Sequence, residues 1–158
     1  GFTIASKYKI LRGSMPTTTE EKKAWAKVEA IIYEFKQADK YLFAVPMWNF
    51  SIPYRLKHYI DILVQPGYTF RVANGGYEGL VLDKRAMAIY ARGGSYAEGT
   101  PGAALDMQQK YLELILQFIG IEDIRSILVE STLGGGPDAE QKAVREGIEQ
   151  ARLLVTGF

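Results

Sequence analysis

The amino-acid sequence predicts an α/β protein with a parallel sheet and helices on both of its faces. Helical and strand-like patterns alternate along the chain, and the series begins and ends with a helix. This alternation is typical of parallel strands joined by helical crossovers, and right-handed crossovers place helices on both faces. The expected strands are short apolar runs, as in a parallel sheet that is buried on both sides.

Length and composition fit a single domain over residues 1–158. The chain is 47% hydrophobic and contains no cysteine, which excludes disulfides, thiolate metal sites and cysteine nucleophiles. The formal net charge of +1 argues against nucleic-acid binding through a broadly basic surface. No run of about 20 apolar residues could form a membrane span. We therefore expect a cytoplasmic protein that acts without nucleic acid, membrane or metal.

The first elements follow a locally basic arm at residues 1–19. A helix is expected to begin near Pro16, because threonine hydroxyls are available as caps and acids follow in the first turn. Its apolar side chains recur at spacings of three and four as far as Phe35, so one face is apolar. The next run, Tyr41–Val45, is the first expected strand, and it suits burial on both faces.

A second helix and a folded-back segment come next. Ser51 is expected to cap this helix, with Pro53 in its first turn, and residues 66–67 (Pro-Gly) end it. Residues 68–72 and 80–82 flank a turn-forming Asn-Gly-Gly sequence, which favours a hairpin or a folded loop. The remaining expected elements are a strand at Arg85–Tyr90, a long helix from about Thr100 to Phe118, a strand at Ile124–Glu130 and a helix from about Pro137 to Val155.

Ligands of open parallel sheets bind at the carboxyl ends of the strands, which directs attention to the loops after Val45 and Tyr90. The first loop contains Met47, Trp48, Asn49 and Phe50 between two prolines. Aromatic rings and an amide suit a flat heterocycle with a polar edge. The alternative is that the rings only fill the gap between strand and helix.

The second loop begins with Arg92 and two glycines. Gly93 and Gly94 would let a ligand approach the backbone, leaving amide N–H groups for its acceptors. Arg92 could add positive charge, and Tyr96 a hydroxyl or a ring. The alternative is an ordinary turn between strand and helix, since a lone Gly-Gly pair is a weak signal.

The two loops belong to a larger set of motifs. Between Ala24 and Leu154 the chain carries, in order, Pro-Met-Trp-Asn-Phe-Ser-Ile-Pro (46–53), Leu-Lys-x-Tyr-x-Asp (56–61), Gly-Tyr-Thr-Phe (67–70), Gly-Leu-Val (79–81), Ala-Arg-Gly-Gly (91–94) and Phe-Ile-Gly-Ile (118–121). This set closely resembles the FMN-dependent NADH-azoreductases of the flavodoxin-like NAD(P)H:quinone oxidoreductase superfamily.

The resemblance implies a flavodoxin-like, doubly wound, three-layer α/β/α fold and an FMN-dependent oxidoreductase. NADH or NADPH would deliver hydride to the flavin, and a quinone or azo compound would then take its place, in a ping-pong reaction. The chemistry would be centred on the flavin, with no catalytic side chain. The resemblance assigns the cofactor to Met47, Trp48, Asn49 and Phe50 in the first loop and to Ala91, Arg92, Gly93, Gly94 and Tyr96 in and beside the second. It also implies a homodimer with the flavin at the interface, where Tyr68 and Phe70 help to wall the substrate site.

Flavodoxin-like sheets have five parallel strands in the order 2-1-3-4-5, and only three are recognisable here. We therefore expect that the N-terminal strands are missing and that the natural chain is about a third longer. The first of the missing strands would carry the FMN phosphate loop, so a chain of only these residues is expected to bind FMN weakly or not at all.

Two other functions remain open. The chain could be a flavodoxin-like electron carrier that binds flavin without turnover. It could also be an interaction domain that has lost the cofactor. The single histidine, His58, is expected to be solvated or packed, and Lys57 and Asp61 to form an exposed pair.

Overall fold

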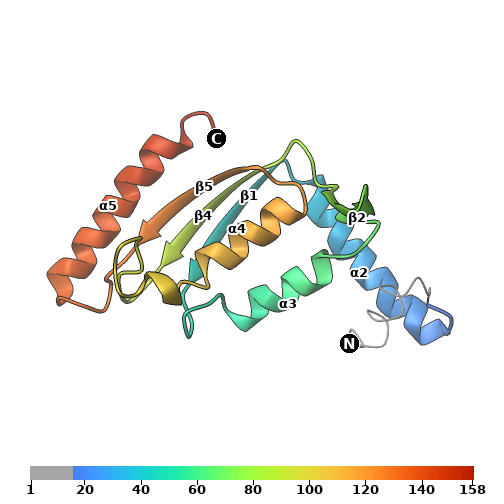
Figure 1. The fold of residues 1–158 in the computed structure, drawn as a ribbon, viewed down its shortest axis with the longest axis horizontal. Coiled ribbons are helices and arrows are strands. Elements are labelled where there is room, and N and C mark those ends of the chain that lie inside the picture. Colours follow the sequence, from blue (N-terminus) through green and yellow to red (C-terminus); the bar gives the residue numbers. More distant parts are fainter. Residues whose placement is uncertain (1–15) are drawn as a thin grey trace.

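A computed structural model describes residues 16–158 and contains a three-stranded parallel sheet in the order β1-β4-β5, together with a separate two-stranded hairpin (Figure 1). The elements are, in chain order, α2 (Thr19–Gln37), β1 (Lys40–Pro46), α3 (Tyr54–Leu63), β2 (Phe70–Ala73), β3 (Gly76–Gly79), β4 (Arg85–Ala91), a 3₁₀ turn (Ala103–Leu105), α4 (Gln109–Phe118), β5 (Asp123–Val129) and α5 (Pro137–Val155). The expected alternation of helices and parallel strands is confirmed.

The register of the sheet brings the ends of all three strands to one edge. Pro46 of β1 is paired with Ala91 of β4, and Ala91 is paired with Val129 of β5. Since these residues end their strands, the loops that follow them share the carboxyl edge of the sheet. This edge is the place where open parallel sheets bind ligands.

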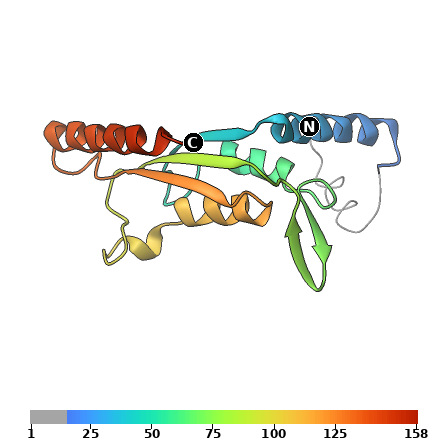
Figure 2. The ribbon, with the colours of Figure 1, turned by 90° about the horizontal axis from the view of Figure 1, so that it is seen from above.

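Helices cover the two faces of the sheet unequally. Figure 2 shows α4 and α5 on opposite sides. Tyr41 and Val45 of β1 belong to the same buried cluster as side chains of α2, α3 and α4. On the other face, Gly147 lets α5 approach β5 closely, because a Cβ there would lie 2.8 Å from Val129. Leu42 also points away from the main core and is 68% exposed, so the expectation that both faces of β1 are buried is wrong.

Helix α2 begins as its sequence indicates. The N–H of Glu21 donates to the Thr18 hydroxyl, and the Glu21 carboxylate accepts the N–H of Thr18. This reciprocal pair is a capping box, which satisfies donors that a helix N-terminus leaves free. Of the expected arm, only residues 16–19 lie among the described residues.

The expected long helix from Thr100 to Phe118 is wrong in its first half. Residues 100–108 form turns and a single 3₁₀ turn, and α4 begins only at Gln109. The Asp106 carboxylate accepts the N–H groups of Gln108 and Gln109, at 3.0 and 3.1 Å. These bonds hold the chain in a turn at Asp106, two residues before Gln108, which is the N-cap of α4.

The expected cap of α3 is also wrong. Pro53 holds the N-cap position, and no side chain caps this helix. Ser51 instead pairs with Trp48 through its main chain, and its hydroxyl donates to the Met107 carbonyl at 3.4 Å. Ser51 is therefore part of the preceding turn.

The hairpin of β2 and β3 confirms the expected fold-back. Asn74 and Gly75 form its turn with φ angles of 52° and 77°, as a two-residue type I′ turn requires. The second strand is residues 76–79 rather than the expected 80–82. Val81 has already left the hairpin, because its N–H donates to the Ile119 carbonyl. None of the helices in the described part of the chain is long and apolar enough to cross a membrane.

Candidate cofactor site at the carboxyl edge of the sheet

The first loop is a tight turn that holds two non-glycine residues in left-handed backbone. Trp48 and Ser51 exchange both main-chain hydrogen bonds, at 2.8 and 3.0 Å, around Asn49 and Phe50. Asn49 has φ 47° and Phe50 has φ 67°. Asparagine tolerates this conformation, whereas phenylalanine adopts it only when the surroundings impose it. Strain of this kind is concentrated at functional sites.

The rings of this loop face outward. Trp48 is 53% exposed and Phe50 is 46% exposed, so the alternative that they only fill the gap between strand and helix is wrong. The Phe50 ring meets Tyr96 of the second loop edge to face, with ring centres 6.3 Å apart. The turn thus presents flat apolar surface beside the second loop.

The second loop has main-chain N–H groups that make no hydrogen bond to a described residue. The carbonyls of Arg92, Gly93 and Gly94 each accept an N–H at 3.1 Å, and the donors are Thr132, Leu133 and Ser131 in that order. In a trans peptide the carbonyl and the following N–H point in opposite directions. The N–H groups of residues 93, 94 and 95 therefore point away from this backing segment, and none of them donates to a described residue.

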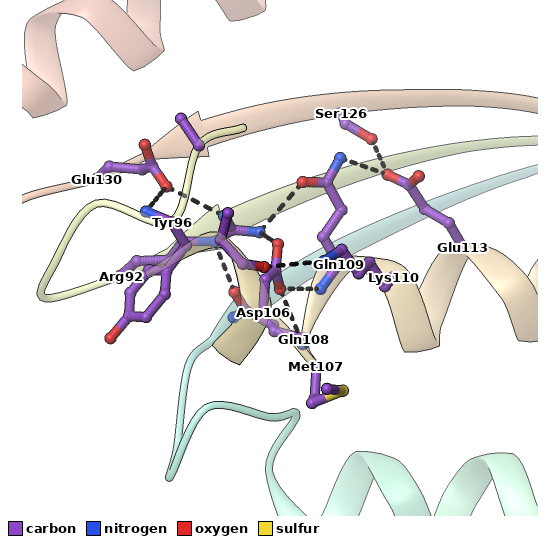
Figure 3. A network of polar contacts seen from close by, with 12 residues as sticks. Arg92, Tyr96, Asp106, Met107, Gln108, Gln109, Lys110, Glu113, Ser126 and Glu130 are labelled. Atoms are coloured by element: carbon purple, nitrogen blue, oxygen red, sulfur yellow. Dashed lines mark hydrogen bonds and ion pairs between the residues drawn. The ribbon is translucent and has the colours of Figure 1, made fainter. Parts of the chain in front are cut away.

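The Arg92 side chain lies in a buried network behind the loop (Figure 3). Its guanidinium pairs with Asp106 at 3.0 Å and with Glu130 at 3.1 Å. Its main-chain N–H donates to the Val129 carbonyl at 2.9 Å. The expectation that Arg92 offers positive charge to a ligand is wrong, because both its charge and its main chain are used inside the protein.

Sequence reasoning missed the residues that hold the two loops. Asp106 and Gln108 are buried between them, just before α4. Asp106 carries a signal that could have been used, because an Asp ahead of an apolar helical pattern is a favoured cap. Gln108 carries no such signal, since its role depends on partners far away in the sequence.

Tyr68 and Phe70 lie at the other end of the sheet. Helix α3 runs back from the carboxyl edge, so the residues after it are near the start of β4 (Figure 1). The Tyr68 hydroxyl donates to Glu29 at 2.5 Å. The pKa of Tyr68 is raised, mainly by burial and to a lesser extent by this hydrogen bond. Phe70 is buried against Phe118. A single chain therefore does not bring these residues to the two loops.

An open groove lies on the α3 side of the first loop. It has a volume of about 430 Å³, and its lining residues are Trp48, Asn49, Ser51, Ile52, Tyr54, Lys57 and Tyr111. The expected exposed pair between Lys57 and Asp61 is present at 2.5 Å, and His58 is exposed. Among residues 16–158, no group of three or more potential ligands is arranged to hold a metal ion.

Comparison with known proteins gives consistent matches over most of the chain. A family model described as flavodoxin-like fold matches residues 4–154. An FMN-dependent NADH:quinone oxidoreductase of Nitratidesulfovibrio vulgaris (strain DP4) is 51% identical over 143 residues, which are 90% of this chain and 68% of that protein. A protein of the same name from Desulfotalea psychrophila is 49% identical over 97% of this chain and 72% of its own length.

Solved structures lead to the same group of proteins. An azoreductase from Bacillus anthracis str. Sterne is 34% identical, with a TM-score of 0.82 over 95% of this chain and 71% of that one. An FMN-dependent NADH-azoreductase from Bacillus anthracis str. Ames Ancestor, solved in complex with FMN, is 29% identical with a TM-score of 0.78, over 95% of this chain and 72% of that one.

Proposed function

The chain belongs to the family with the flavodoxin-like fold, and we propose that it is an FMN-dependent NADH:quinone oxidoreductase that also reduces azo compounds. The observation that carries this proposal is the pairing of two loops at one sheet edge. One loop presents exposed rings on a strained turn, and the other presents a row of unused N–H donors. A flat heterocycle with acceptor atoms along one side, such as the isoalloxazine of FMN, needs both features.

The two loops would share the work of holding the cofactor. Trp48 and Phe50 offer their rings to its flat faces, and Asn49 offers an exposed amide. Gly93 and Gly94 direct their N–H groups to its acceptor edge. Arg92 would act from behind by fixing these peptides. The full proposed set of cofactor residues is Met47, Trp48, Asn49, Phe50, Ala91, Arg92, Gly93, Gly94 and Tyr96.

The protein's part in the reaction is orientation and electrostatics. FMN, when bound, supplies the redox chemistry by taking hydride from NADH and passing two electrons to the quinone or azo compound. The N–H groups of residues 93–95 are fixed in advance, so they stabilise negative charge at the acceptor edge without having to reorganise. The half-exposed rings provide flat surface for planar acceptors. No side chain acts as a nucleophile in this scheme.

We further propose a cytoplasmic homodimer in which Tyr68 and Phe70 of one subunit wall the substrate site of the other. The family resemblance implies that these residues line the site, and since they lie at the far end of the sheet from the loops of their own chain, a second subunit would have to supply them. The neighbouring hairpin carries the exposed side chains of Val72 and Tyr77, which gives it apolar surface for a partner. Light scattering of the purified protein would test the dimer.

The test of the function is an anaerobic titration of the purified protein mixed with FMN. We expect NADH to bleach the visible flavin band and a quinone to restore it, with catalytic turnover when both are in excess. Free FMN at the same concentration is the control. If the protein binds FMN but dithionite alone bleaches it, the chain is a flavin-binding electron carrier rather than this enzyme.

A further inference from the structure

Gln108 connects the two cofactor loops although it belongs to neither. Its side chain is 0% exposed at the start of α4. Its Nε2 donates to the Val45 carbonyl at 2.7 Å, where β1 enters the first loop. Its Oε1 accepts from Arg92 Nε at 2.9 Å, where β4 enters the second loop. One amide thus joins the ends of two adjacent strands.

The orientation of this amide is determined by its partners. The Val45 carbonyl can only accept a hydrogen bond, and the Arg92 guanidinium can only donate one. Turning the Gln108 amide over would place oxygen against the Val45 carbonyl and NH₂ against Arg92. Among uncharged side chains of this length, glutamine alone supplies one donor and one acceptor at its tip.

The residues next to Gln108 reinforce this connection (Figure 3). The N–H of Met107 donates to the Phe50 carbonyl at 3.0 Å and so holds the strained turn. Asp106 fixes the main chain of Gln108 with one oxygen and pairs with Arg92 through the other. The segment from Asp106 to Gln108 therefore contacts both loops, and nearly all its polar contacts are out of the solvent.

We propose that Gln108 is a positioning residue that sets the spacing between the ring-bearing turn at Asn49–Phe50 and the N–H donors at Gly93–Gly94. It does not touch the cofactor. This inference rests on the proposed function only for the identity of the ligand, because the coupling of the two loops is a property of the chain itself.

The test replaces Gln108 by Met, which keeps the length of the side chain and removes both hydrogen bonds. We expect FMN to bind on the order of 10-fold or more weakly, because a loss of register between two contact groups is costly. Fluorescence quenching of FMN measures this dissociation constant, and the midpoint potential of bound flavin should shift as well. A purely structural role would leave both values unchanged in the folded fraction.

Hydrogen exchange followed by NMR gives a readout that needs no cofactor. The informative amides are hydrogen-bonded ones: those of Met47 and Ser51 in the first loop, and those of Thr132 and Leu133 behind the second. In Gln108→Met we expect all four amides to exchange faster. Amides in the last turns of α4 should exchange faster only to the extent that the global free energy of unfolding falls.

Gln65→Met is the matched control. Gln65 is the other fully buried glutamine among the described residues, and its Nε2 donates to the carbonyls of Asp61 and Ile62 at the far end of α3. We expect this variant to lose stability while retaining FMN affinity and the protection of both loops.

Two results would overturn the proposal. One is a Gln108→Met protein that loses stability as Gln65→Met does but binds FMN like the wild type. The other is faster exchange in only one of the two loops. If the wild-type protein binds FMN but NADH does not reduce it, the proposed function fails while the Gln108 comparison still stands. If these residues alone bind no FMN, the exchange pattern by itself decides whether Gln108 couples the loops.

Discussion

Both ends of the parallel sheet carry aromatic side chains, but these are packed together at the amino end and exposed at the carboxyl end. At the amino end, aromatic rings pack on one another: Phe35 stacks on Tyr41 with centres 4.2 Å apart, and Phe70 lies 4.8 Å from Phe118. At the carboxyl end, Trp48 and Phe50 stand half-exposed. Aromatic content alone therefore does not distinguish a core from a candidate site.

The two type I′ turns express the same contrast in the backbone. The hairpin turn uses Asn74 and Gly75, so the residue in the second position has no Cβ to strain. The turn at the carboxyl edge uses Asn49 and Phe50 with similar φ angles. A bulky ring in left-handed backbone costs stability, so its presence indicates that the ring is needed at that place.

One of the two largest effects we expect comes from the buried ion pairs at the carboxyl end. Arg92→Leu leaves the Asp106 and Glu130 carboxylates without their cation, which costs about 3–5 kcal/mol of unfolding free energy. Urea denaturation measures this loss. Arg71→Leu is the control, because Arg71 pairs with Glu78 on the exposed hairpin and its removal should hardly change stability. Equal losses in both variants would contradict the contrast between the two ends.

Of the two tryptophans, Trp25 should affect the stability of the fold and Trp48 should affect FMN binding. Trp25 is 3% exposed in the core, so Trp25→Ala should cost about 3–5 kcal/mol. Trp48→Ala should change stability by no more than about 0.5 kcal/mol and should weaken FMN binding. Denaturant unfolding and FMN quenching of the same two proteins provide the measurements. A large stability loss in Trp48→Ala would mean that its ring is structural.

Replacing the second residue of each turn should change the free energy of unfolding in opposite directions. Phe50→Gly relieves left-handed strain and should stabilise the fold by up to about 1 kcal/mol while weakening FMN binding. Gly75→Ala introduces strain and should destabilise by about 1 kcal/mol with FMN binding retained. Thermal unfolding ranks the variants. A destabilised Phe50→Gly protein would show that the ring contributes packing that outweighs the strain.

The smallest effect concerns alkaline pH at the amino end. Burial raises the pKa of Tyr41 from 10.0 to about 12. The folded state therefore favours the neutral phenol, and stability is complete below about pH 10 and is lost as pH rises towards about 12. Tyr41→Phe should show a shallower fall of the urea midpoint over this range than the wild type. The decline should persist in part, because burial also raises the pKa of Tyr90.

Much of the fold could be predicted from local patterns. Residues Pro137–Val155 form a helix with the expected bounds, and the expected strands at 41–45, 85–90 and 124–130 differ from the structure by a residue or so at each end. The helix expected from Thr100 is wrong in its first half because the Asp106 side chain holds a turn there, well after the apolar pattern begins. The spacing of hydrophobic residues alone cannot predict such a competing hydrogen bond.

The candidate site was predicted in its position and only partly in its roles. Parallel strands share a carboxyl edge, so the loops after Val45 and Tyr90 had to be neighbours. Arg92 had a different role from the expected one because its partners, Gln108 and Glu130, lie 16 and 38 positions away in the chain. The expectation that these residues alone bind FMN weakly or not at all stays a prediction, and the titration described above tests it.

The sequence by itself determined the order of the elements, the parallel sheet and the two loops at its edge, because these follow from periodicity and from turn-forming residues read locally. The tertiary structure alone decided that the rings of the first loop face outward, that Arg92 serves the interior, and that Gln108 joins the two loops. These outcomes depend on which distant groups satisfy a buried charge or carbonyl. Only the folded chain brings such groups within hydrogen-bonding distance.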